Sequence, residues 1–65
     1  MTNEIKNSIN KYFMAKAMWN EMYHDIDIRL EMEKQMNYWH LQADSKLMAQ
    51  GFTSLQRDEI FENWN

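Results

Sequence analysis

The stretch "HDIDIRLEMEKQM", residues 24–36, decides the fold, because two secondary structures are compatible with it. Apolar residues occupy every second position at Ile26, Ile28, Leu30 and Met32, with charged residues between them. Such alternation is typical of a β-strand with one buried face, but a helix that is apolar on two faces gives the same pattern. The choice decides whether the chain folds on itself or pairs with another chain.

Composition favours the helix over the strand. Proline and valine are absent, and Gly51 is the only glycine. Residues 3–50 are rich in Met, Leu, Ala, Glu, Gln and Lys, which are good helix formers. A strand needs a partner strand, and no other segment alternates in this way. The sequence therefore predicts an all-α protein forming a single domain over residues 1–65.

Side chains placed at about 100° per residue around one axis fall on two apolar faces. The first face holds seven residues: Ile5, Ile9, Tyr12, Trp19, Tyr23, Ile26 and Leu30. The second, nearly opposite, holds nine residues: Met14, Met18, Met22, Ile28, Met32, Met36, Trp39, Ala43 and Leu47. Both faces are apolar between residues 14 and 30, and this overlap explains the alternation.

Two arrangements account for two opposite faces. In the preferred one the chain bends between Tyr23 and Asp27, with Asp25 or Asp27 capping a second helix. This predicts a helical hairpin over residues 3–23 and 26–50. In the other, one unbroken helix of nearly fifty residues spans ~70 Å and is buried only by coiling with another chain. Both arrangements leave excess apolar surface.

The last third of the sequence contains a helix end and a helix start. Gly51 suits the position after a helix, where a left-handed backbone conformation costs glycine little. Thr53 and Gln56 have the spacing of a capping box. We expect a short helix over residues 54–64, with Phe52 packing at the joint. The apolar residues expected to be buried are Leu55, Ile60, Phe61 and Trp64.

Size and charge limit the possible functions. A chain of 65 residues buries only about 60% of its unfolded surface, so we expect a homodimer or a protein partner to stabilise it. The seven Lys and Arg residues are scattered and outnumbered by ten acids, which argues against direct nucleic-acid binding. No apolar run suits a membrane span or a signal peptide. With no cysteine present, we expect a cytoplasmic protein.

Few residues have the arrangement that catalysis or metal binding requires. Glu21 and His24 have the Glu-x-x-His spacing of ferritin-like di-iron helices, which would need a further glutamate, such as Glu31 or Glu33, and a two-fold partner. We expect instead a solvated helix face and no metal site.

Aromatic and hydroxyl side chains give equally little indication of chemistry. Tyr38, Trp39 and His40 lack the basic groove of a base-stacking surface, so we expect Trp39 to serve in packing. The serine and threonine hydroxyls have no glycine-rich loop beside them. We expect no cofactor and no enzymatic activity.

Methionine is the most informative residue type. Met14, Met18 and Met22 recur every four residues, and Met32 and Met36 continue the same face. Flexible, polarizable methionines fill irregular cores, and they also adapt to partner surfaces. Part of the second face is therefore the candidate partner-binding surface, comprising Met14, Met18, Met22, Ile28, Met32, Met36 and Trp39.

The segment "AQGFTSLQRDEIFENW", from Ala49 to Trp64, resembles the C-terminal end of small helical proteins encoded by phages and mobile elements of Gram-positive bacteria. In those proteins a helix ends at Gly-Phe-Thr and a short acidic helix follows. Arg57 replaces the alanine usual in that motif. The resemblance implies an accessory protein that binds and redirects a host protein. Two alternatives are a metal-binding dimer using Glu21 and His24, and an assembly component of a virion or larger complex.

Overall fold

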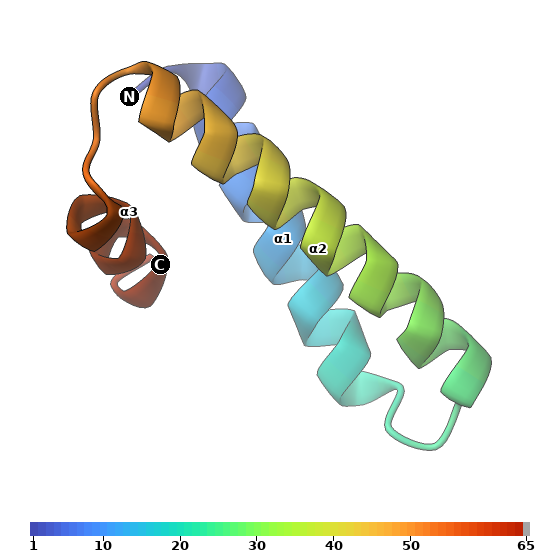
Figure 1. Ribbon diagram of the computed structural model, residues 1–65. Helices are drawn as coiled ribbons and strands as arrows, with labels where there is room; N and C mark the ends of the chain where they lie inside the picture. Colours follow the sequence, from blue (N-terminus) through green and yellow to red (C-terminus); the bar gives the residue numbers. More distant parts are fainter. Residues whose placement is uncertain (65) are drawn as a thin grey trace.

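The computed structural model, which describes residues 1–64, consists of three helices, as the sequence predicts. Helices α1 (Asn3–Glu21) and α2 (Ile26–Ala49) form an antiparallel hairpin, and α3 (Ser54–Glu62) folds back beside one end of it (Figure 1). We call that end the base and the end at the 22–25 turn the tip. The stretch with alternating residues begins α2, so the strand interpretation is wrong.

The bend between the two long helices has a local cause. The Asp25 side chain accepts a hydrogen bond from the backbone N–H of Ile28 at 3.1 Å, which satisfies a free donor in the first turn of α2. The backbone N–H of Asp25 donates to the carbonyl of Met22 at 3.1 Å, which closes the turn. The hairpin is therefore confirmed, with Asp25 as its cap, and the unbroken helix is wrong.

The joint between α2 and α3 follows the pattern that Gly51 and Thr53 predict. Gly51 has a φ of 90°, and its N–H donates to the carbonyl of Met48. The N–H of Phe52 donates to the carbonyl of Leu47 at 3.2 Å, which completes a Schellman motif. Thr53 and Gln56 then form both hydrogen bonds of the capping box.

The core lies at the base of the hairpin. Ile5 and Ile9 from α1 are buried against Ala43 and Leu47 from α2. Five partly buried apolar side chains surround these four residues: Phe13, Phe52, Ile60, Phe61 and Trp64. The core therefore combines the N-terminal residues of the first predicted face with the C-terminal residues of the second. Neither face is buried along its whole length.

The prediction that Leu55 is buried is wrong, since its side chain is 69% exposed. At about 100° per residue, Leu55 lies about 140° from Ile60 and about 120° from Phe61, the two residues of α3 that pack against the core. Arg57 instead lies between Ile60 and Phe61 on the inward side of α3. Its Nε donates to Asp44 Oδ1 at 2.7 Å, and Nη1 donates to the carbonyl of Phe52 at 2.8 Å.

Candidate partner-binding surface

A shallow groove between α1 and α2 holds the central part of the predicted partner-binding surface. Its volume is about 210 Å³. Seven residues line it: Lys11, Met14, Ala15, Met18, Met32, Gln35 and Trp39. We call this surface the Met–Trp groove.

The groove opens on a different side of the hairpin from α3. His40 contacts Phe61 of α3, with the two ring centroids 4.5 Å apart, whereas the preceding residue, Trp39, lines the groove. Consecutive helical residues point about 100° apart, so α3 leaves the groove open to solvent.

Methionine exposure gives the groove an apolar rim. The side chain of Met14 is 68% exposed and that of Met18 is 41% exposed, while Ala15 between them is buried and forms the floor. Met32 is half-buried on the α2 side. Single exposed apolar residues are ordinary on proteins, but two methionines one turn apart beside a tryptophan form a continuous surface.

The structure does not bring all seven predicted residues into the groove. Met22 lies at the tip, in a separate hollow beside the turn. Ile28 and Met36 are half-buried and do not line the groove. The second face is divided between the two helices, so only its middle part forms this groove.

Trp39 is held in a fixed orientation by neighbours on both helices. Its Nε1–H donates to Gln35 Oε1 at 3.2 Å, and Gln35 Nε2 donates to Glu31 Oε1 at 3.2 Å. Lys11 Nζ lies 4.4 Å from the Trp39 ring centroid, within range of a cation–π interaction. The indole therefore has a satisfied polar atom and an apolar ring, as an interface anchor needs.

Lys11, Ala15 and Gln35 are groove residues that sequence reasoning missed. A signal for them exists, because Lys11 and Ala15 precede groove methionines by three residues, and Glu31, Gln35 and Trp39 follow one another at four-residue intervals. Residues three or four apart are neighbours on a helix surface. The additional information required is that α1 packs against α2, which brings these residues into one groove.

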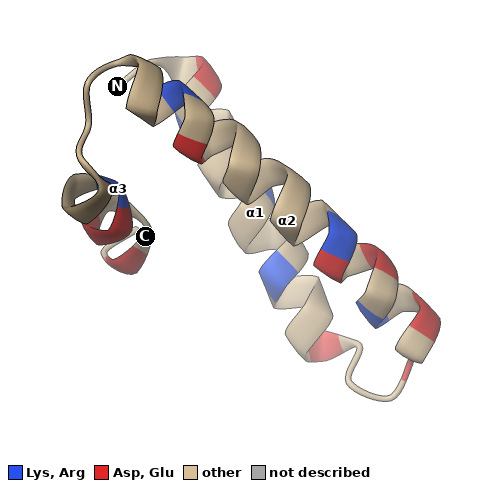
Figure 2. Ribbon diagram, viewed as in Figure 1, with Lys and Arg blue, Asp and Glu red and all other residues tan. Residues whose placement is uncertain are grey.

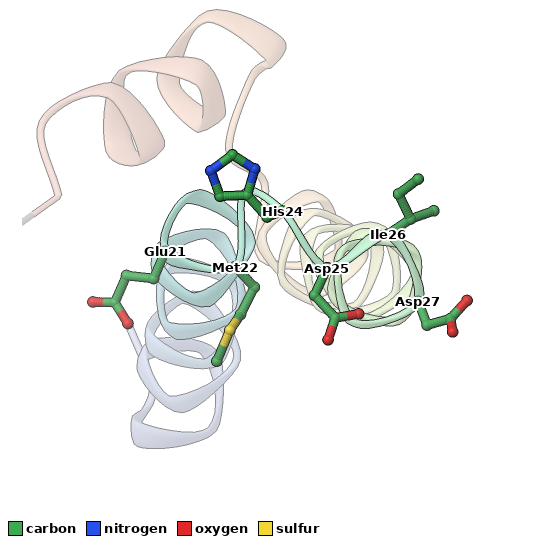
Figure 3. A pocket seen from close by; sticks show the side chains of 6 residues that line it. All are labelled: Glu21, Met22, His24, Asp25, Ile26 and Asp27. Carbon is green, nitrogen blue, oxygen red and sulfur yellow. The ribbon is translucent and has the colours of Figure 1, made fainter.

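Glu21 and His24 do not share a helical face. Helix α1 ends at Glu21, so His24 belongs to the turn. The three-residue spacing therefore does not place the two side chains on one helical face. A hollow of about 430 Å³ lies here, and Figure 3 shows that the Glu21 carboxylate and the His24 imidazole point in different directions. Asp25 and Asp27 also diverge (Figure 3). Within residues 1–64, no three His, Asp or Glu side chains are grouped closely enough to hold a metal ion.

The three aromatic residues at positions 38–40 lie in three different environments. Tyr38 is exposed and meets Trp39 edge-on at 4.8 Å between ring centroids. Trp39 lines the groove, and His40 packs against Tyr12 and Phe61 on the α3 side. The three rings therefore form no common stacking surface.

The hydroxyl groups are used locally. Ser8 is buried and its Oγ–H donates to the carbonyl of Glu4 at 3.1 Å. The Thr53 hydroxyl accepts from the N–H of Gln56 in the capping box. Both groups serve helix structure, and neither contacts a histidine or a carboxylate through the hydrogen bonds described.

The comparisons with known proteins add no relative. No family model, curated protein or solved structure matches this chain. Among the helices within residues 1–64, none combines the length and the apolar character needed to cross a membrane.

Proposed function

We propose that the protein is a non-catalytic binding module that docks its Met–Trp groove onto a helix of another protein. The observation that supports this is the exposed pair Met14 and Met18 beside the oriented ring of Trp39. A helix laid along a groove between two helices buries apolar side chains spaced at three or four residues. Tryptophan is among the residues that contribute most to such interfaces, and methionines adapt to irregular partners.

Charge around the groove supports a protein partner over nucleic acid. Lys11 is the one cation that lines the groove in the described part of the chain, and the whole sequence carries a net charge of −3. Neutralising consecutive phosphates requires a row of cations. A partner helix with apolar residues facing the methionines and a carboxylate near Lys11 matches the groove.

We further propose that the partner is a host protein in the cytoplasm of a bacterium, and that the chain acts as a phage-type inhibitor or regulator. The likeness of residues 49–64 to small phage and mobile-element proteins supports this proposal. Self-association into a homodimer is also part of the proposal, because a chain of this size buries little apolar surface alone.

Affinity purification from a bacterial lysate, followed by mass spectrometry, tests the groove. We expect a host protein to be recovered with the wild type and lost with Met18→Glu and with Trp39→Ala. Leu55→Glu is the matched control, because Leu55 is exposed on α3 away from the groove. Circular dichroism establishes that each variant is folded.

Two results contradict the proposal. One is recovery of the same protein with Met18→Glu as with the wild type. The other is formation of large oligomers by the purified wild type without any host protein, which indicates an assembly component. A stoichiometric metal lost in Glu21→Ala indicates the metal-binding alternative.

A further inference from the structure

A second apolar surface lies at the tip of the hairpin and shares no lining residue with the Met–Trp groove. The side chains of Ile26 and Leu30 are 72% and 54% exposed, and Tyr23 beside them is also exposed. A hollow of about 240 Å³ adjoins Leu30 and is lined by Trp19, Ile26, Arg29, Leu30 and Glu33. We call these exposed residues and the hollow the tip patch.

The tip patch and α3 lie on the same side of α2, at opposite ends. Ile26 precedes Asp44 by eighteen residues, which is five complete turns at 3.6 residues per turn, so both point the same way. Asp44 binds Arg57 of α3. Helix α3 therefore occupies this side at the base and leaves it open at the tip (Figure 1).

Charged residues of both signs lie beside the tip patch. The first turns of α2 carry both signs close together, whereas the middle of the helix is uncharged (Figure 2). At about 100° per residue, Asp27, Glu31 and Lys34 lie on one flank of Leu30, and Arg29 and Glu33 lie on the other. One flank therefore has two acids and one base, and the other has one acid and one base.

We propose that a second copy of this chain covers the tip patch, with the two α2 helices antiparallel and centred between residues 30 and 31. The proposal builds on the self-association proposed above and assigns its surface. A two-fold axis makes every contact occur twice, with residue i of one copy facing residue j of the other. Leu30 of each copy then lies over the hollow beside Leu30 of the other.

In this register four of the five charged residues of the two flanks face an opposite charge, and Glu31 lies beside the two-fold axis. In an antiparallel pair, the same flank of each helix meets its counterpart. Asp27 of one copy faces Lys34 of the other, because the two residues are equally distant from the centre. Arg29 of one copy lies opposite residue 32 of the other, one residue away from Glu33. Arg29 has no ion pair within the described chain, and its guanidinium carbon lies 4.0 Å from the Trp19 ring centroid, at the edge of the hollow.

The position of α3 favours the antiparallel copy over a parallel one. A parallel copy runs the length of α2 and lies alongside α3, where α3 packs against His40 and Asp44. An antiparallel copy overlaps only residues 26–35, about 15 Å of helix, and ends before α3. Such a short overlap buries less area than a standard interface, so we expect a reversible dimer that leaves the Met–Trp groove free.

Sedimentation equilibrium over a concentration series tests the surface. We expect the wild type to dimerise and Leu30→Glu to weaken the dimer at least roughly tenfold, since it buries an unpaired charge at the centre. Leu41→Glu is the matched control, because Leu41 is also more than half exposed on α2 but lies outside the overlap. Met18→Glu should dimerise like the wild type, which separates this proposal from that of the groove.

A charge exchange tests the register. Asp27→Lys should weaken the dimer, because it faces Lys34 twice, and Asp27→Lys combined with Lys34→Asp should restore it. In a parallel pair, the same exchange places like charges together and restores nothing. A wild type that stays monomeric, equal loss from Leu30→Glu and Leu41→Glu, or no restoration by the exchange overturns the proposal.

Discussion

At the base of the hairpin, Leu47 is fully buried among residues of all three helices, whereas Leu30, seventeen residues earlier on the same helix, is more than half exposed at the tip. Both belong to an apolar side of α2, and both are leucines. The difference lies in what faces them. Helix α3 covers the base, and no described element covers the tip (Figure 1).

Helix length explains why only one end is covered. The nine residues of α3 span about 13 Å, whereas the twenty-four residues of α2 span about 36 Å. A short third helix that starts at the base therefore cannot reach the tip. The chain thus has a small core at one end and two apolar surfaces that remain available for other molecules.

The largest expected difference between the two ends is in the free energy of unfolding when one leucine is replaced by alanine at each end. We expect Leu47→Ala to lower the free energy of unfolding by about 3 kcal/mol, because it leaves a cavity in the core. A domain this small has a total stability of only a few kcal/mol, so most molecules should be unfolded. Leu30→Ala should change the free energy by less than about 0.5 kcal/mol.

Urea unfolding followed by circular dichroism measures both values, at a protein concentration low enough to keep the chain monomeric. Equal losses from the two substitutions would show that the tip is as well packed as the base, and would remove the basis for the tip patch as a binding surface.

The two arginines of the chain extend the comparison to polar contacts. Arg57, at the base, is 14% exposed and binds both Asp44 and the carbonyl of Phe52. Arg29, at the tip, stacks on Trp19, and its buried Nε has no hydrogen-bond partner among the described residues. We expect Arg57→Ala to cost about 2 kcal/mol, because it removes charge-assisted hydrogen bonds that hold α3.

Arg29→Ala should cost less than about 1 kcal/mol, which is the scale of a partly exposed cation–π contact. Thermal unfolding measures both, and Trp64 fluorescence in a background of Trp19→Phe and Trp39→Phe reports on α3 alone. Early loss of the Trp64 signal in Arg57→Ala is expected. A cooperative transition unchanged from the wild type would contradict the role given to Arg57.

Local signals made the helices predictable from the sequence. Asp25, Gly51 and Thr53 act on backbone groups within a few residues of themselves, so each helix boundary could be placed to within about two residues. The hairpin followed from the bend at Asp25. These features need no knowledge of what lies elsewhere in the chain.

Contacts between distant elements were less predictable. Arg57 joins Asp44 across the joint between α2 and α3, and a charged residue on an inward face gives no apolar signal. Leu55 was expected to be buried because it is apolar and lies at helical spacing from Ile60 and Phe61, but its angle on α3 is more than 100° from both of these residues. The groove was half predicted: its methionines share a helical face, but Lys11 and Gln35 joined it only when α1 paired with α2.

The smallest expected effect is the pH dependence of an exposed ion pair at the base. Lys46 Nζ lies 2.8 Å from Glu4 Oε1, and this hydrogen bond and the positive charge lower the pKa of Glu4 from its ordinary value of 4.5. A carboxyl whose pKa is lower in the folded chain stabilises the fold above its unfolded pKa, and that contribution is lost as the pH falls through the folded pKa. Glu4→Gln should therefore be slightly less stable than the wild type at pH 7. The difference should begin to shrink as the pH falls to about 4.5, and it should vanish once the pH is below the lowered pKa of the folded chain. Melting temperatures across this pH range measure the effect. In a Lys46→Met background, the Glu4→Gln substitution should change the melting temperature little at any pH.

High salt should reduce the difference in melting temperature between the wild type and Glu4→Gln, since solvent reaches both side chains of the ion pair. A difference that persists in acid would assign the contribution of Glu4 to its place in the first turn of α1 and not to Lys46.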